Sequence, residues 1–242
     1  MKLLIRPAPE VAIKSKPVRR QQMRHLRQNI RKLLARLDPE IRVEGSWDRV
    51  DVEVPDGRGL SGPALELLLR IPGISTIQEI GAFPFVSLED VAEKAVEAFA
   101  DRLAGKTFAV RARRHGEHSF RSIDLERTVG AALMQASGAS GVDLKSPQVE
   151  VRIEVQDDQF HIAHRKHRGL GGYPLGSVEN VLTLISGGYD SSVAAYLMMR
   201  RGLRNHFLFF NLGGTAHEVG VRQVVHYLWD RYGASHSAKF IS

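Results

Sequence analysis

The feature that most constrains the fold of this chain is the segment VLTLISGGYDSSVAAYLMMRRG at residues 181–202. An apolar run of strand length enters Ser-Gly-Gly, and a helix-like run over 190–201 follows at once. A second apolar run, 206–210, leads into a helical pattern over 216–232, and the later KFI begins a third strand. Short apolar strands that alternate with helices are typical of a doubly wound parallel sheet. We therefore expect 177–242 to hold the start of such an α/β domain, which usually needs roughly 150–200 residues.

The loop after the strand at 181–185 has the composition of a phosphate-binding loop. Ligands of a doubly wound sheet bind beyond the carboxyl ends of the strands, which is where this loop lies. Gly187 and Gly188 can adopt positive φ and bring backbone N–H groups close to an anion. The N-terminus of the following helix adds the positive end of its dipole. Three serines supply hydroxyl donors: Ser186, Ser191 and Ser192.

Asp190 is the acid within this loop, and it would repel a bare phosphate. We expect it either to hold Mg²⁺ or to pin the loop by accepting backbone N–H bonds. The loop has neither the lysine of G-x-x-x-x-G-K-[ST] nor the spacing of G-x-G-x-x-G. The alternative interpretation is a glycine turn with a Ser/Asp helix cap. The preceding apolar strand and the following amphipathic helix favour phosphate binding.

The first part of the chain predicts a different architecture. Strand and helix patterns follow one another in the order β-α-β-β-α-β, which is typical of a ferredoxin-like α+β unit. The elements are a strand at 2–6, a helix over 17–37, hairpin strands at 41–45 and 49–54, a helix over 61–70 and a strand at 75–80.

A second α+β unit follows. Ser87 is a good N-cap for a helix that runs to about Leu103. The next elements are a strand at 107–113, a helix over 123–136 and strands at 148–155 and 159–164. The glycine- and base-rich run RKHRGLGGYPLG, 165–176, is predicted to be a linker or a functional loop. We therefore expect three domains, at 1–75, 76–176 and 177–242.

The positive charge of the chain is concentrated in one segment. The net charge is +7, whereas residues 11–37 alone carry nine bases and no acid, so the remainder sums to −2. Such a local excess indicates a polyanionic partner such as nucleic acid. A solvated helix face is the alternative, although like charges at i, i+4 destabilise a helix that has no anion to bind.

The composition excludes several classes of site. There is no cysteine, so these residues hold no disulfide, thiolate metal site or cysteine nucleophile. No apolar run approaches the roughly 18 residues of a membrane-spanning helix, and the start has no signal-peptide core. We expect a cytoplasmic protein with no membrane partner.

The motifs of the chain resemble one enzyme family over nearly its whole length. SGGxDS after a strand is the signature of the PP-loop ATP pyrophosphatases. Residues 182–233 closely resemble the start of the catalytic domain of the tRNA 4-thiouridine synthetases (tRNA uracil 4-sulfurtransferases, the ThiI family). The opening LIRPAPEVAIKS, RIPGI at 70–74 and HRGLGGYPLG at 167–176 match the same family in the same order. On this resemblance, 1–75 is its N-terminal ferredoxin-like domain, 76–176 its THUMP RNA-binding domain and 177–242 an incomplete PP-loop domain, so that the chain is truncated.

The resemblance implies a reaction and a set of partners. Members of the family adenylate O4 of the uridine at position 8 of tRNA with ATP and Mg²⁺. A persulfide charged by a cysteine desulfurase then displaces AMP and leaves 4-thiouridine. Some members also pass sulfur to thiamine thiazole synthesis, which implies a thiamine sulfur-carrier protein as a further partner. Whether the protein is a homodimer stays open.

The resemblance also implies the roles of individual residues. Asp190 and Ser186 would be catalytic, with Asp190 the candidate Mg²⁺ ligand, and no other metal site is expected. The ATP-binding residues would be Leu184, Ile185, Ser186, Gly187, Gly188, Asp190, Ser191, Phe209 and Phe210.

The candidate tRNA-binding residues combine the basic helix with two further basic clusters. In the strand at 107–113, period-two spacing places Arg111 and Arg113 on one face. The full set is Lys14, Arg20, Arg24, Arg27, Arg31, Arg111, Arg113, Arg114, Arg165, Lys166 and Arg168.

Two other functions remain open at this stage. One is a PP-loop enzyme that acts on a small molecule, and the basic segment 11–37 counts against it. The other is a tRNA-binding fragment without activity, since the family's later ATP-binding segments and its sulfur-carrying cysteines are absent from these residues.

Overall fold

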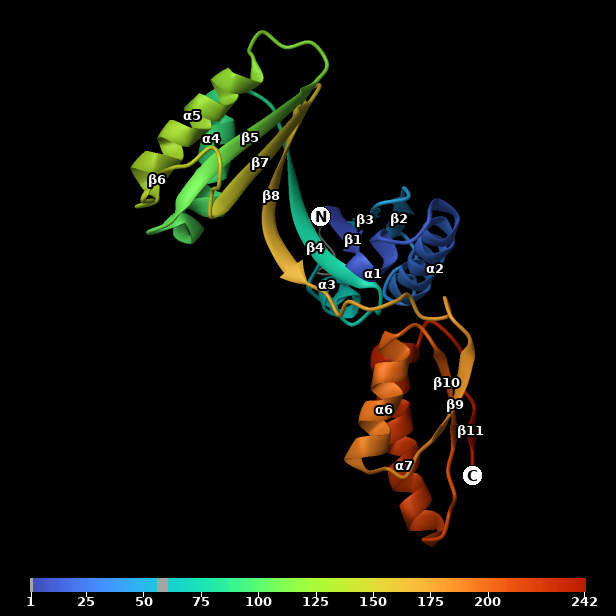
Figure 1. Cartoon of the computed structure of the whole chain (residues 1–242). Helices are drawn as coiled ribbons and strands as arrows, with labels where there is room; N and C mark the ends of the chain where they lie inside the picture. Colours follow the sequence, from blue (N-terminus) through green and yellow to red (C-terminus); the bar gives the residue numbers. More distant parts are fainter. Residues whose placement is uncertain (1, 56–60) are drawn as a thin grey trace. The chain divides into compact units, whose positions relative to one another are not determined.

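The structure is a computed structural model that describes residues 2–55 and 61–242 (Figure 1). The chain forms two compact units. Unit 1 contains residues 1–2 and 78–166, and unit 2 contains residues 3–77 together with 167–242. The chain passes from one unit to the other after residue 2 and again within strands β4 (Ile74–Pro84) and β8 (Gln159–Arg168). In the described part of the chain, no helix is both long and apolar enough to span a membrane.

The first half of unit 2 is the ferredoxin-like domain that the sequence predicts. Its strand order is β2-β3-β1-β4, and β2 pairs with β3 as an antiparallel hairpin. Helix α2 covers the sheet with a buried stripe that includes Leu26 and Ile30. The short helix α1 was not expected. Besides β4, the elements are β1 (Lys2–Pro7), α1 (Pro9–Ala12), α2 (Lys16–Leu34), β2 (Arg42–Gly45), β3 (Val50–Glu53) and α3 (Ser61–Leu69).

Unit 1 is the second α+β domain. Strand β5 lies between β6 and β7 and is parallel to both, while β7 and β8 are antiparallel. Helix α4 begins as predicted, since Oγ of Ser87 accepts the N–H of Asp90 at 3.1 Å. The core joins α4 and α5 to the sheet through Phe99, Phe108 and Phe160. The remaining bounds are α4 (Leu88–Leu103), β5 (Thr107–His115), α5 (Ser122–Ala136), β6 (Gly141–Val142) and β7 (Val149–Gln156).

One prediction for the basic run 165–168 was wrong. We expected Arg165, Lys166 and Arg168 to lie in a glycine-rich loop, but they belong to β8, which continues to Arg168. Strand β8 neighbours β4 in the strand order, and directly after β8 the N–H of Gly169 donates to the carbonyl of Ser75 in β4 at 2.8 Å. Ladder pairing therefore extends the strand past the point at which apolar alternation stops. The loop begins at Gly169, and Gly171 and Gly172 follow within it.

The second half of unit 2 is a three-stranded parallel sheet in the order β11-β10-β9. Helices α6 and α7 lie together on one side of it (Figure 1). Their shared core includes Ile185, Met199, Phe207 and Val225. The bounds are β9 (Asn180–Leu184), α6 (Tyr189–Arg200), β10 (Arg204–Leu208), α7 (Gly214–Leu228), the π-helical η1 (Trp229–Gly233) and β11 (Phe240–Ile241).

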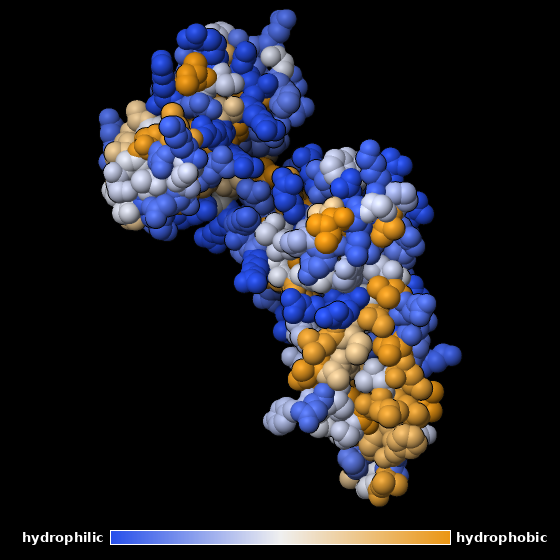
Figure 2. All heavy atoms as spheres, viewed as in Figure 1, coloured by the Kyte–Doolittle hydropathy of each residue, from blue (hydrophilic) through white to orange (hydrophobic). Residues whose placement is uncertain are grey.

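The other face of this sheet is bare among the described residues. Leu182 and Leu184 of β9 are 52% and 60% exposed, and Phe210 after β10 is 67% exposed. Figure 2 shows hydrophobic atoms gathered on the side of these strands that α6 and α7 leave open. Parallel sheets normally have both faces covered. The predicted parallel sheet is therefore present, and among the described residues helices cover one of its faces.

Candidate functional site

The glycine-serine loop joins the carboxyl end of β9 to the first turn of α6. Gly187 has φ +81°, and a Cβ at this position would lie 2.9 Å from Cγ2 of Val221 in α7. Gly188 is extended, with φ −80° and ψ 170°, and is the N-cap of α6. The loop therefore needs glycine at 187 both for its backbone conformation and for its packing against α7.

The serines organise the loop from within. Oγ of Ser191 accepts the N–H of Ser186 at 3.2 Å and lies 3.1 Å from Oγ of Ser186. The hydroxyls of Ser191 and Ser192 can both donate to the carbonyl of Gly188, at 3.2 and 2.7 Å. Helix α6 has no side-chain cap at its N-cap, so its first-turn N–H groups have no such acceptor and remain available to an anion. These observations fit a phosphate bound at the loop.

Asp190 is exposed in the first turn of α6. We expected this carboxylate either to hold Mg²⁺ or to pin the loop through backbone N–H bonds. No hydrogen bond of its side chain occurs among the described residues, and the bonds that shape the loop come from its serines. The described residues contain no group of three or more His, Cys, Asp or Glu side chains that could enclose a metal ion. A Mg²⁺ ion here would therefore rest on Asp190, phosphate oxygens and water.

The other predicted nucleotide contacts divide into two kinds. Leu184 is the last residue of β9 and pairs in register with Leu208, the last residue of β10. Leu184 and Phe210, which follows β10, are both exposed. Ile185 and Phe209 are 3% exposed and belong to the core. The side chains of Leu184 and Phe210 can thus touch a ligand, whereas Ile185 and Phe209 shape the edge from beneath.

A polar network at the same edge of the sheet was missed by the sequence analysis. Glu218 of α7 accepts bonds from Asn211, which follows β10, and from Ser242, which follows β11, each at 3.0 Å. Arg222 also donates to Glu218, and this ion pair is the main cause that lowers the pKa of Glu218. The position of Asn211 just past an apolar strand was the available signal.

The basic stripe predicted on α2 consists of Arg20, Arg24, Arg27 and Arg31. Two of these residues bind other parts of the fold, and two are free among the described residues. Arg27 and Arg31 donate to the carbonyls of Gly45 and Val43 in β2, at 2.7 and 2.8 Å. Strand β2 lies at the edge of its sheet, so these guanidinium groups bind carbonyls that lack a strand partner. The positive charges of Arg27 and Arg31 are thereby explained by the fold.

Arg20 and Arg24 remain exposed, with no hydrogen bond or ion pair among the described residues. They lie four residues apart on one helix and so face the same direction. Lys14 lies 5.6 Å from the centroid of the Tyr173 ring. Arg20 and Arg24 are therefore the members of the stripe best placed to contact a polyanion.

In unit 1, the basic residues of β5 differ in their surroundings. Phe108 and Val110 enter the core, so Arg111 and Arg113 lie together on the opposite face, as predicted. Arg111 donates to the carbonyl of Leu144 and lies 3.6 Å from a carboxylate oxygen of Glu150. Arg114 donates to the carbonyl of His118 at 3.3 Å.

Three of the predicted unit-1 cations are exposed and, within the described ranges, unpaired. Arg113, Arg165 and Lys166 have no hydrogen bond or ion pair among the described residues. Arg165 lies close enough to Arg102 to lower its pKa, although burial is the larger cause. Arg168, which belongs to unit 2, is also exposed.

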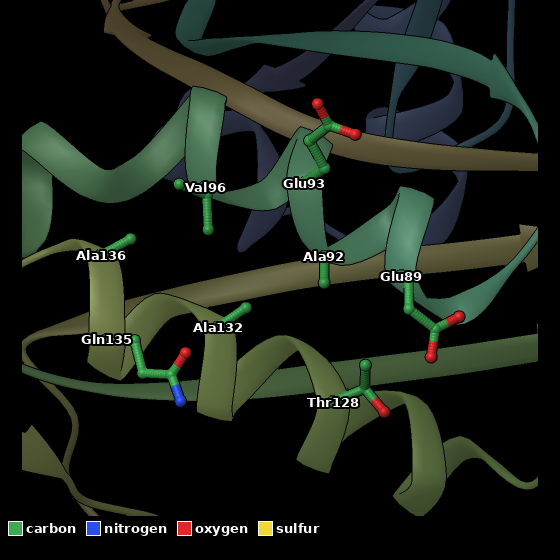
Figure 3. Close-up of a pocket in the computed structure, with 8 residues that line it drawn as sticks. All are labelled: Glu89, Ala92, Glu93, Val96, Thr128, Ala132, Gln135 and Ala136. Carbon is green, nitrogen blue, oxygen red and sulfur yellow. The ribbon is translucent and has the colours of Figure 1, made fainter.

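The groove between α4 and α5 in unit 1, of about 500 Å³, does not fit an anion. Its floor is formed by small side chains, among them Ala92 and Ala132, which face each other across the two helices (Figure 3). Glu89 and Glu93 add carboxylates to its lining. It lies in a different unit from the glycine-serine loop.

Three family profiles match the chain in succession. Residues 2–77 match the ThiI ferredoxin-like domain, residues 85–165 match the THUMP domain, and residues 176–242 match the thiamine biosynthesis protein ThiI. The boundaries that we predicted at 75/76 and 176/177 stay a prediction.

Curated relatives cover the whole chain. A tRNA sulfurtransferase of Marinobacter nauticus is 81% identical over all 242 residues, and one of Pseudomonas aeruginosa is 51% identical. The chain spans about half of each relative, 50% in both cases. A solved 4-thiouridine synthetase–RNA complex with bound ATP has a TM-score of 0.74 at 22% identity, covering 99% of this chain and 61% of that one. A protein from Pyrococcus horikoshii has a TM-score of 0.71, covering 100% of this chain and 79% of that one. Both structures share the fold of this chain.

Proposed function

The chain belongs to the ThiI family of tRNA sulfurtransferases, and we propose that it supplies the RNA-binding and phosphate-binding parts of an ATP-dependent tRNA uracil 4-sulfurtransferase. The observation that carries the proposal is the glycine-serine loop with the uncapped first turn of α6. It offers backbone and hydroxyl donors to a polyphosphate at the carboxyl edge of a parallel sheet. The exposed cations of α2 and of unit 1 offer contacts to RNA phosphates.

The residues of the loop would bind and orient ATP. Gly187, Gly188 and the first-turn N–H groups of α6 would hold the β- and γ-phosphates, with Ser186 and Ser191 donating from the side. ATP supplies an adenylyl group that turns O4 of a uridine into a leaving group. Asp190 would hold Mg²⁺ there, because carboxylate oxygen is a preferred ligand of that ion. Leu184 and Phe210 would exclude water on the nucleoside side.

The sulfur in this proposal comes from a persulfide that a cysteine desulfurase charges. The 242 residues contain no cysteine, so the thiol that carries this sulfur lies outside them. Transfer of sulfur to a thiamine sulfur carrier belongs to the same proposal, and so does a cytoplasmic location. The second candidate is a tRNA-binding fragment without activity, which the bare sheet face favours for these residues taken alone.

The test is Asp190→Ala in this chain joined to the C-terminal half of the Marinobacter nauticus relative, which is 81% identical over these residues. We expect ATP–pyrophosphate exchange and 4-thiouridine formation to fall by at least about 100-fold, the magnitude typical of losing one group that stabilises developing charge. Affinity for tRNA should change less than about twofold, because one solvent-exposed group away from the basic segments contributes little to RNA binding.

The matched control is Glu179→Ala, which removes an exposed acid that immediately precedes β9, at its opposite end from the loop. This variant should keep its activity. Normal 4-thiouridine formation by Asp190→Ala would refute the assignment of Asp190.

A further inference from the structure

Four basic side chains converge where α2 meets the second half of unit 2. His25 and Lys32 come from α2, Arg204 begins β10, and His236 follows η1. The packing around them is direct. Asn29 donates to the carbonyl of Leu175 at 2.9 Å, and Arg36 donates to the carbonyl of Ala234 at 2.7 Å. The four residues, called the junction cluster below, are thus held by both parts of the unit.

The centre of the junction cluster lies against Gly176. A Cβ at Gly176 would lie 2.7 Å from Nε of Arg204 and 2.7 Å from Nε2 of His236. Gly176 also has φ +80°, which side chains rarely adopt. Glycine at this position therefore allows an arginine and a histidine nitrogen to approach the same point on the backbone.

A polar atom of the junction cluster and one on the residue after Gly176 lack partners within the described part of the chain. Nε of Arg204 is buried and has no hydrogen-bond partner among the described residues, and the same holds for Oγ of the adjacent Ser177. Nδ1 of His236 lies 3.0 Å from Oγ of Ser235, which leaves Nε2 on the side of Arg204. A buried donor without an acceptor costs free energy, and an arginine donor is always charged. The geometry therefore calls for an acceptor with negative charge.

The electrostatics agree with the geometry. Burial, followed by the charges of Arg204 and Lys32 and then His25, lowers the pKa of His236 to about 4. Burial and the charges of Arg204 and Arg24 lower the pKa of His25. The groups that act on these two rings are all basic, and no described carboxylate contributes to either shift. The junction cluster is thus a site of positive potential without its own counter-ion.

We propose that the junction cluster binds one phosphate of an RNA backbone, with Arg204 and His236 donating to its oxygens and Lys32 and His25 at its sides. The identity of the anion as RNA rests on the proposed function, whereas the site itself rests on the geometry. The exposed Arg24 lies one residue from His25, so a strand bound here would continue toward Arg24 and Arg20. Residues Arg204, His236, His25 and Lys32 extend the basic set inferred from the sequence.

The experiment measures RNA affinity of the 242-residue chain against salt and pH. Arg204→Gln should lower the log–log salt slope by about 0.7–0.9, the value for one phosphate contact. The control is Arg42→Gln, which removes an equal charge from an exposed position on β2 and should change the slope less. Thermal unfolding of both variants checks that each folds.

The pH arm tests the histidines. A bound phosphate raises the pKa of His25 and His236, so their protonated forms bind more tightly and affinity should rise as the pH falls from 7.5 to 5.5. His236→Gln should flatten this dependence. The proposal would be overturned if the wild type binds RNA but Arg204→Gln has the wild-type salt slope and His236→Gln has the wild-type pH dependence. The proposed RNA-binding function would stand in that case.

Inorganic phosphate separates failure of the site from failure of the proposed function. If the wild type binds no RNA, the proposed function fails, and the imidazole NMR signal of His236 is then followed during a phosphate titration. A shift that Arg204→Gln abolishes would retain the junction cluster as a site for free phosphate. Absence of that shift would overturn the site as well.

Discussion

At the scale of single residues, the two glycines of the glycine-serine loop have different roles. Gly187 has positive φ and packs against Val221, whereas Gly188 is extended and a Cβ there would lie 3.4 Å from Oγ of Ser186. The sequence shows both as one dipeptide. Their backbone conformations differ because Gly187 lies in the turn that packs against α7, whereas Gly188 is the N-cap of α6.

We predict that Gly187→Ala lowers the free energy of unfolding by about 1–2 kcal/mol, the usual cost of forcing a side chain into the left-handed region. Gly188→Ala should cost less than about 0.5 kcal/mol, since its backbone conformation suits any residue. Urea unfolding of both variants measures the difference. Equal losses in the two variants would show that Gly187 is not conformationally restricted in solution.

At the scale of elements, α2 binds its own sheet through part of its positive charge. Arg27 and Arg31 hold the edge strand β2, and Lys32 and Arg36 reach the carbonyls of Ser235 and Ala234. Residues 11–37, which include α2, carry nine bases. The helix is stable despite this charge because several of the bases are hydrogen-bonded to carbonyls. Charge counting alone cannot distinguish these residues from ones that contact RNA.

Two double variants separate these roles. Arg27→Gln with Arg31→Gln should lower the free energy of unfolding by about 1–3 kcal/mol, because each loses a charge-assisted bond to a carbonyl. Arg20→Gln with Arg24→Gln should leave stability within about 0.5 kcal/mol and lower the salt slope of RNA binding by about 1.4–1.8 for two contacts.

Chemical unfolding and RNA binding at several salt concentrations provide both readouts. Both double variants remove the same charge, so each is the control for the other. A change in stability for the Arg20 and Arg24 pair, or an unchanged salt slope, would contradict their assignment as free RNA-binding cations.

At the scale of the whole molecule, the parallel sheet explains what this chain can do alone. Its strand order β11-β10-β9 proceeds in one direction, so both right-handed crossovers place their helices on the same face. The opposite face, with Leu182 and Leu184, is open (Figure 2). Strand β9, which leads into the phosphate loop, lies at the end of the strand order.

We predict that residues 1–242 bind tRNA but form no 4-thiouridine when supplied with ATP, cysteine and a cysteine desulfurase. The free cations of both units are present, but one face of the sheet that carries the loop is bare and no cysteine can hold a persulfide. Filter binding and a thiolation assay measure the two activities, with the Marinobacter nauticus relative as the active control. Thiolation by the 242 residues alone, or binding no tighter than that of a neutral protein, would contradict this prediction.

The sequence by itself determined the order of the longer helices and strands and the fold class of each domain. Helices and strands followed from apolar periodicity, and the Ser87 cap and the hairpin of β2 and β3 followed from local chemistry. These features depend on residues close together in the chain, so a sequence displays them. The glycine-serine loop was recognisable for the same reason, because strand, turn and helix are contiguous.

Tertiary structure alone decided which charged residues are free and which are bound. Arg27 and Arg20 are equivalent in the sequence, but β2 lies within reach of Arg27 only through the fold of the whole domain. The junction cluster unites residues 25 and 236, and the Glu218 network unites residues 211 and 242. Strand β8 likewise extends to Arg168 beside β4, which is distant along the chain, not because its own pattern continues. In each case the partner is distant along the chain, and long-range packing brings the two together.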